Sequence, residues 1–254
     1  MATENLDTTI LYLTDNQLDP FIADSCRRLL LESSCGLPII SVSQKPIDFG
    51  ENICVGEIGR SGLSMDTQTL EGLLRIKTKW IAFAEHDCIY SEEHFKWVPP
   101  DEENFWYNDN VWLAQYINPN HPEWDGMYSY VKGRRVQSQL ICSTKLLLNA
   151  TQEKIGILGD PAWVIRHPTR AIGEPGAADY NKTMRLTKYR SLRSVRVRLK
   201  RYITEHHARD FKTVIPNIDI RHGNNFTGPR RGKNRRFELE PWGKLEDVLN
   251  GKRR

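Results

Sequence analysis

Trp80-Ile-Ala-Phe-Ala84-Glu85-His86-Asp87 is the stretch of sequence that decides the fold. Five apolar residues are too few for an independent helix, and the run ends abruptly in three polar residues, which favours a short buried strand. Ligands of open α/β proteins bind at the carboxyl ends of the strands, so we expect Glu85 and Asp87 at such an edge. On a strand they share one face, because they are two residues apart.

The segments before this run alternate between strand and helix patterns. Thr8 to Thr14 and Leu37 to Ser43 are predicted strands, and residues 18–31 place apolar side chains near helical spacing. Asp66 is expected to cap a further helix that carries Leu70, Leu73 and Leu74 on one face. The alternation predicts an α/β fold with a mostly parallel sheet and helices on both faces.

The pattern changes after Asp87. An aromatic stretch, 104–115, reads as one extended segment whose rings are in part core and in part able to stack on sugars or unpaired bases. The other expected elements are a hairpin of 127–131 with 134–143 around Lys132-Gly133, a helix over 145–155, loop over 156–179 and a basic amphipathic helix over 186–203.

Composition narrows the class of protein. The 254 residues contain no run of eighteen apolar residues, so no transmembrane helix is expected, and the polar, acidic start does not resemble a secretory signal. Five scattered cysteines, without a Cys-x-x-Cys pair, suit reduced thiols and a cytoplasmic location.

Charge is distributed unevenly along the chain. Residues 185–236 carry sixteen Lys and Arg against three Asp and Glu, a local net charge of +13 in a chain of net charge +4. This excess predicts a polyanionic partner, either nucleic acid or an anionic membrane surface, although a solvated helical face has the same composition. We therefore divide the chain into an α/β domain, 1–184, and a basic C-terminal helical and loop segment, 185–254.

The acidic strand end also has a chemical interpretation. Hard carboxylate oxygens at Glu85 and Asp87 suit Mg2+ or Mn2+ bridging a diphosphate, whose charge such an ion neutralises as the diphosphate departs. A polar turn has the same residues and remains the alternative.

The first ninety residues resemble the nucleotide-binding half of A-type-fold glycosyltransferases that use UDP-sugars. The matching segments are Leu11–Thr14, Leu37–Ser43, Gly59-Arg60-Ser61-Gly62, Gln68 to Gly72 and Trp80 to Asp87. Glu85 replaces the first Asp of the family's Asp-x-Asp motif, so Asp87 fits the stronger metal position. The chain is also similar to glycosyltransferases of bacteriophages, some of which modify hydroxymethylated pyrimidines in DNA, and this would place it in the cytoplasm of a bacterial host.

The resemblance implies a donor site. A C-terminal histidine, His222, would join Glu85 and Asp87 around Mn2+ or Mg2+, and imidazole suits Mn2+ better than Mg2+. The resemblance implies a UDP-sugar as the nucleotide-sugar donor. The remaining expected contacts to it are Thr14, Asp15, Asn16, Arg60, Gln68, Arg230 and Arg231.

Several residues are candidates for the catalytic base and for contacts to the acceptor. Glu174 is the expected catalytic base, with Asp109 and Asp160 as rivals, and each of the three also suits a turn or cap. Arg193, Arg196, Arg235 and Arg236 are expected to contact an acceptor, for which hydroxymethylated phage DNA is our first choice. A glycan or lipid-linked acceptor, and a non-catalytic nucleic-acid-binding protein, are the alternatives. The oligomeric state stays open.

Overall fold

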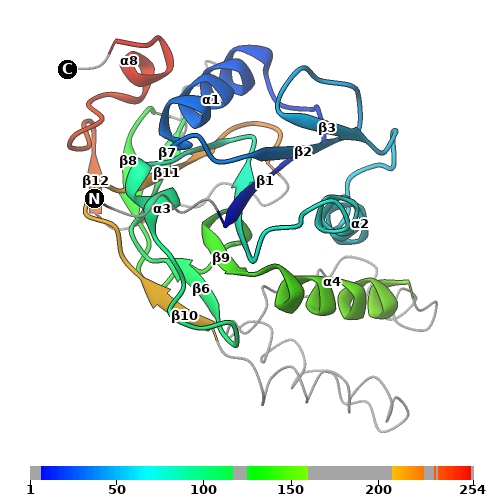
Figure 1. Ribbon diagram of the computed structural model, residues 1–254. Helices are drawn as coiled ribbons and strands as arrows, with labels where there is room; N and C mark the ends of the chain where they lie inside the picture. The colour runs from blue at the N-terminus through cyan, green and yellow to red at the C-terminus, as the bar shows by residue number, and fades with distance from the viewer. Residues whose placement is uncertain (1–6, 117–124, 160–207, 226–231, 233, 253–254) are drawn as a thin grey trace, which may run out of the picture.

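The computed structural model describes residues 7–116, 125–159, 208–225, 232 and 234–252 (Figure 1). Its larger sheet has seven strands in the order β10-β6-β9-β4-β1-β2-β3. These strands are β1 (Thr8–Thr14), β2 (Ile39–Ser43), β3 (Glu51–Cys54), β4 (Trp80–Glu85), β6 (Phe105–Asn108), β9 (Leu140–Ser143) and β10 (Ala208–Phe211).

The larger sheet is mostly parallel. β3, β2, β1 and β4 pair in parallel, as do β6 and β10, and among the described strands of this sheet β9 alone runs against its neighbours. β1 and β4 lie at the centre, in register from Thr8 opposite Trp80 to Leu13 opposite Glu85.

Helices cover both faces of this sheet. α2 (Gly62–Leu73) and α4 (Thr144–Leu158) pack against each other on one face, and α1 (Pro20–Ser33) and α3 (Glu92–Lys96) lie on the other (Figure 1). Every residue of β1 is buried because the strand is covered on both sides, which explains its unbroken apolar and β-branched sequence. The predicted fold class is therefore confirmed.

A smaller sheet, ordered β12-β8-β7-β11-β5, adjoins the larger one. Its core includes Ile22, Cys26 and Leu29 of α1, while Leu30 of the same helix packs in the core of the larger sheet. α1 thus belongs to both cores. The remaining elements are β5 (Cys88–Ile89), β7 (Val111–Gln115), β8 (Tyr128–Tyr130), the short 3₁₀ helix η1 (Gln137–Gln139), β11 (Asn217–Arg221), β12 (Asn234–Arg236) and α8 (Leu245–Leu249).

The chain crosses between the two sheets through very short linkers. Only His86-Asp87 separates β4 from β5, and only Asp109-Asn110 separates β6 from β7. The aromatic stretch 104–115 is therefore two strands in different sheets rather than one extended segment. Phe105 and Tyr107 are fully buried, so these two rings have the core role that was expected for part of the stretch.

The predicted hairpin around Lys132-Gly133 is wrong. β8 pairs with β7 and β12 in the smaller sheet, whereas β9 pairs with β4 and β6 in the larger one. Two apolar runs joined by a Gly-containing turn have the sequence of a hairpin. Here the two runs enter different sheets instead, β8 between β7 and β12 and β9 between β4 and β6.

The predicted cap of α2 is wrong as well. Ser61 caps this helix by accepting a hydrogen bond from the Ser64 amide, 3.0 Å away. Asp66 lies inside the helix, where its carboxylate accepts from Lys154 of α4 at 2.8 Å in a buried ion pair.

β3, which pairs in parallel with β2, was not predicted. The two end residues of this strand, Glu51 and Cys54, are exposed, and its four residues show no apolar pattern.

The basic helix over 186–203, the expected loop from residue 160 to 179 and the boundary at 184/185 fall outside the described residues. Residues 156–158, predicted as the start of that loop, instead continue α4. β10 and β11, both C-terminal to that boundary, occupy places in the larger and the smaller sheet. Among the described helices, none has the length and apolar character needed to cross a membrane.

Candidate metal and donor site

The two-residue linker between β4 and β5 holds the central side chains of the site. The carbonyl oxygen of Asp87 accepts a hydrogen bond from the Ile220 amide of β11 at 2.8 Å. On the other side, the amide of Glu85 donates to the Tyr90 hydroxyl at 3.0 Å. Pairing on both sides of so short a linker fixes its backbone, so His86 and Asp87 are positioned without any ligand.

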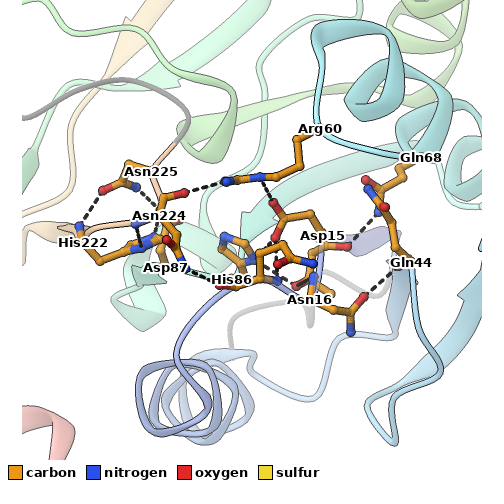
Figure 2. Close-up of polar contacts among 12 residues, drawn as sticks. Asp15, Asn16, Gln44, Arg60, Gln68, His86, Asp87, His222, Asn224 and Asn225 are labelled. Carbon is orange, nitrogen blue, oxygen red and sulfur yellow. Dashed lines mark hydrogen bonds and ion pairs between the residues drawn. The ribbon is translucent and has the colours of Figure 1, made fainter. Parts of the chain in front are cut away.

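His222 comes to Asp87 from far along the chain. It directly follows β11, which pairs with β5 and β7, and its Nε2 lies 3.4 Å from Asp87 Oδ2 (Figure 2). The same carboxylate oxygen accepts from the side-chain amide of Asn225 at 2.9 Å. Sheet pairing thus brings together two residues that the resemblance suggested as partners.

The charge states at this linker follow from burial and neighbours. Burial by itself would raise the pKa of Asp87, but the polar contact with the His222 ring and the electrostatic influence of His86, His222 and Arg221 outweigh it, so the pKa falls and the carboxylate is ionised. Burial lowers the pKa of His86, which favours neutral imidazole. Burial also raises the pKa of Cys88 well above its usual value, so this thiol stays protonated and is a poor ligand.

Within the described part of the chain, two groups of side chains place potential ligand atoms within 4.8 Å of one another. One is His86 with Asp87 and His222, and the other is Glu85 with Asp87 and Cys88. The first group fits a cation on two observations. Nε2 of His222 is buried and faces the Asp87 carboxylate without forming a well-aligned hydrogen bond to it. Its separation of 3.4 Å from Asp87 Oδ2 also suits two ligands on one ion, since ligands about 2.1 Å from an ion stand about 3.0–3.4 Å apart.

A polar chain extends from the linker to the end of β1. Nδ1 of His86 lies 2.8 Å from Thr14 Oγ1, and Nε of Arg60 lies 2.5 Å from Asp15 Oδ2 (Figure 2). Nη2 of Arg60 also donates to the backbone carbonyl of Asn224 at 2.5 Å. Arg60 therefore joins the loop before α2, the end of β1 and the turn after His222.

Asn16 and Gln68 tie the ends of β1 and β2 together. Oδ1 of Asn16 accepts from the amides of Gln44 and Lys45, both at 2.8 Å. Gln68 is buried, and its side-chain amide donates to the backbone carbonyls of Thr14 at 2.8 Å and Val42 at 3.1 Å. These contacts shape the carboxyl edge and leave little of the Gln68 amide for a ligand.

Asp109 lies at the same sheet edge, in the linker after β6. Its carboxylate accepts from the Tyr130 hydroxyl and from the Gly133 amide, both at 3.2 Å. Arg235 forms an ion pair with Asp125, and the Arg236 guanidinium lies 5.3 Å from the centre of the Trp112 ring. Expected site residues outside the described part of the chain are Glu174, Arg193, Arg196, Arg230 and Arg231, together with Asp160.

Three features were not predicted. No sequence pattern assigned a role to His86, which belongs to a polar triplet, or to Asn224 and Asn225, which belong to a loop. The third is a buried ion pair in which Arg134 Nη2 lies 2.5 Å from Asp219 Oδ2. A signal existed, because Asp219 stands in the middle of the otherwise apolar pattern Ile218-Asp219-Ile220.

No protein-family model matches the chain, and no curated protein matches it. Solved structures that it is similar to include a glycosyltransferase involved in the glycosylation of the major capsid of PBCV-1, at 10% identity and a TM-score of 0.41 over 80% of this chain and 81% of that one. TarS residues 1–349 from S. aureus match at 10% identity and 0.36, over 57% and 49%. HddC from Yersinia pseudotuberculosis matches at 12% identity and 0.39, over 83% and 92%. Function therefore has to be inferred from the site itself.

Proposed function

We propose that the protein is a metal-assisted glycosyltransferase, which moves a sugar from a nucleotide-sugar donor to a hydroxyl group. The observation that carries the proposal is the position of Asp87 and His222. They meet at the carboxyl edge of β4, 3.4 Å apart, in a mostly parallel sheet. Ligands of open α/β sheets bind at this edge.

The residues around this point suit a nucleoside diphosphate. A divalent cation held by Asp87 and His222, with Glu85 beside them, would neutralise the charge that develops on the departing diphosphate. Arg60 already lies between the end of β1 and the 222–225 turn, and its guanidinium fork suits phosphate oxygens. Thr14, Asp15 and Asn16 line the adjoining edge, where the base and ribose of a UDP-sugar would lie.

An inverting transfer also needs a carboxylate that removes the proton of the acceptor hydroxyl. We propose Glu174 for this role, with Asp109 as its rival. Asp109 lies at the correct edge of the sheet, but the Tyr130 hydroxyl and the Gly133 amide already occupy its carboxylate.

The proposal is tested by incubating the protein with a panel of nucleotide sugars and Mn2+ or Mg2+ and measuring release of the nucleoside diphosphate. At least one donor should be hydrolysed or transferred, and a chelator should stop the reaction. Asp87→Asn keeps the volume and removes the charge, so turnover should fall by at least about 100-fold. Glu57→Gln, an exposed acid paired with Lys45, is the matched control and should retain activity. Turnover that persists in excess chelator contradicts the metal role, and no turnover of any donor contradicts the function.

For the acceptor we propose hydroxymethylated pyrimidine in phage DNA, because the local charge of +13 suits a phosphate backbone. Sugar transfer to hydroxymethylated DNA, compared with unmodified DNA and with glycan or lipid-linked acceptors, tests this choice. Transfer to a glycan or lipid-linked acceptor alone would replace it. DNA binding without any donor turnover would instead favour a non-catalytic nucleic-acid-binding protein.

A further inference from the structure

A second imidazole, that of His86, lies beside Asp87 and His222, although the sequence assigned His86 no role. His86, Asp87 and His222 each offer one ligand atom, and the three atoms lie within 4.8 Å of one another. His86 lies on the linker between the sheets, beside Asp87, and the ring centres of His86 and His222 are 6.2 Å apart.

The contacts of Nδ1 of the His86 ring resemble those of a metal-bound histidine. Nδ1 lies 2.8 Å from Thr14 Oγ1 and 3.7 Å from Asp15 Oδ1, so a proton on Nδ1 faces two oxygen atoms. A histidine ligand almost always donates its other ring N–H to such an oxygen, which fixes the tautomer and the ring orientation. Nε2 of His86 then keeps its lone pair for an ion.

The His222 ring is held in the opposite way. Its Nδ1 accepts the backbone N–H of Asn224 at 3.2 Å, so its proton lies on Nε2, which faces Asp87. For His222 to bind an ion through Nε2, this proton must move to Nδ1 and the Asn224 amide must turn away. With its proton on Nδ1, His86 therefore needs no rearrangement to bind an ion, whereas His222 binds after a change in the 222–225 turn.

We propose that His86, Asp87 and His222 form a two-imidazole, one-carboxylate site that selects a transition-metal ion over Mg2+. Imidazole nitrogen suits borderline metals, whereas Mg2+ prefers carboxylate, carbonyl and water oxygens. Two neutral nitrogens beside one carboxylate thus favour Mn2+, Co2+ or Zn2+. The inference rests on the proposed donor-site cation and adds a ligand and a selectivity to it.

The test measures metal binding to the full chain without any sugar donor. Titration calorimetry with Mn2+, Co2+ and Mg2+ should give at least about tenfold tighter binding of Co2+ than of Mg2+. Pulsed electron paramagnetic resonance of bound Mn2+, with 15N-histidine in the protein, should detect two directly bound imidazole nitrogens. Equal affinity for Mg2+, or an all-oxygen coordination shell, would overturn the inference.

Variants locate the ligands. His86→Gln should weaken Co2+ binding by at least about tenfold and remove one imidazole signal. Thr14→Val keeps the ring but removes the oxygen that orients it, and the expected loss is about 10–100-fold. Glu57→Gln is the control and should bind as the wild type does. If His86→Gln keeps both imidazole signals, His86 is not a ligand.

The outcomes separate this inference from the proposed function. Co2+ binding through two imidazoles, without turnover of any nucleotide sugar, would support the site and contradict the transferase. Turnover supported equally by Mg2+, with an unchanged rate in His86→Gln, would do the reverse.

Discussion

His94 shows how one buried side chain makes stability depend on pH. Its ring is fully buried among Tyr90, Phe95 and Phe211, and its Nε2 has no hydrogen-bond partner among the described residues. Burial lowers its pKa from 6.5 to about 3. The unfolded chain therefore takes up the proton first as pH falls, and stability that is complete above pH 6.5 is lost between there and about pH 3.

His94→Phe should remove this dependence, since a phenyl ring suits the aromatic surroundings and cannot be protonated. One such group changes the free energy of unfolding by about 1.4 kcal/mol per pH unit, or about 2 kcal/mol between pH 6.5 and 5. Urea unfolding at several pH values measures it. A wild-type curve and a variant curve that stay parallel below pH 6.5 would show that the ring is charged in the folded state.

The catalytic base is a second question at the level of single residues. Glu174→Gln should lower kcat roughly 10²–10⁴-fold with little change in donor affinity, because it removes proton transfer and not donor contacts. Asp109→Asn is the comparison variant, with the same loss of charge at the same sheet edge. Should Asp109→Asn show the larger loss in kcat, the role moves to that residue.

Part of the arrangement around Asp87 was predictable from the sequence. The structure places Asp87 and His222 together, as expected: Asp87 was proposed because a polar triplet ends an apolar run, and His222 because the resemblance supplied a C-terminal histidine. Gln68 was assigned to the nucleotide, yet its amide is bonded to two backbone carbonyls, because the edge of a sheet has its own unsatisfied groups. His86 needed the structure, since its significance depends on an oxygen of Thr14, seventy-two positions away.

Helix packing supplies a prediction at the scale of elements. A Cβ atom on Gly72 of α2 would lie 2.3 Å from Leu11 Cδ1 and 3.0 Å from Val42 Cγ2, so the helix sits on β1 and β2 at this glycine. Gly72→Ala should destabilise the protein by about 1–3 kcal/mol, the usual cost of overpacking. Chemical denaturation measures the change.

Gly156 of α4 is the matched control. It is exposed, and an added Cβ would meet nothing within 4 Å. Gly156→Ala should stabilise by about 0.5–1 kcal/mol, because alanine loses less backbone entropy in a helix. Equal effects of the two substitutions would show that α2 does not depend on close approach at Gly72.

Sequence patterns predicted the central elements well and their partners less well. β1, α1, β2, β4 and α4 follow from apolar periodicity because they are long enough to show one. The partners of β8 and β9 could not be read in this way, since pairing depends on edges that other segments leave open. Asp66 resembled a cap because Asp favours that position, but a buried lysine from α4 gives it a different environment.

At the scale of the whole molecule, the charge of 185–236 decides between acceptors. If this segment binds a DNA backbone, its affinity for DNA should fall steeply as the salt concentration rises. Binding releases counterions condensed on the phosphates, and this release gains less free energy at high salt. Replacing Arg230, Arg231, Arg235 and Arg236 with Ser should lower affinity for DNA of any sequence and flatten the salt dependence. Fluorescence anisotropy with labelled duplex and single strands measures both.

Donor hydrolysis separates two roles of these arginines. If Arg230 and Arg231 hold the donor diphosphate, hydrolysis without acceptor should fall in a variant that lacks them and survive the loss of Arg235 and Arg236. No DNA binding by the wild type at low salt would exclude the DNA acceptor.

The short linkers between the sheets restrict how the molecule can admit a substrate. Two fully extended linker residues span at most about 7 Å, and β4, β5, β6 and β7 are each hydrogen-bonded to neighbours on their own sheet. The two sheets therefore stay close together at these linkers, and α1, whose side chains pack in both cores, opposes their rotation against each other. Millisecond motion on ligand binding should instead concentrate in the 222–225 turn and the Arg60 loop, with β4 and β5 remaining still, which backbone relaxation dispersion can resolve.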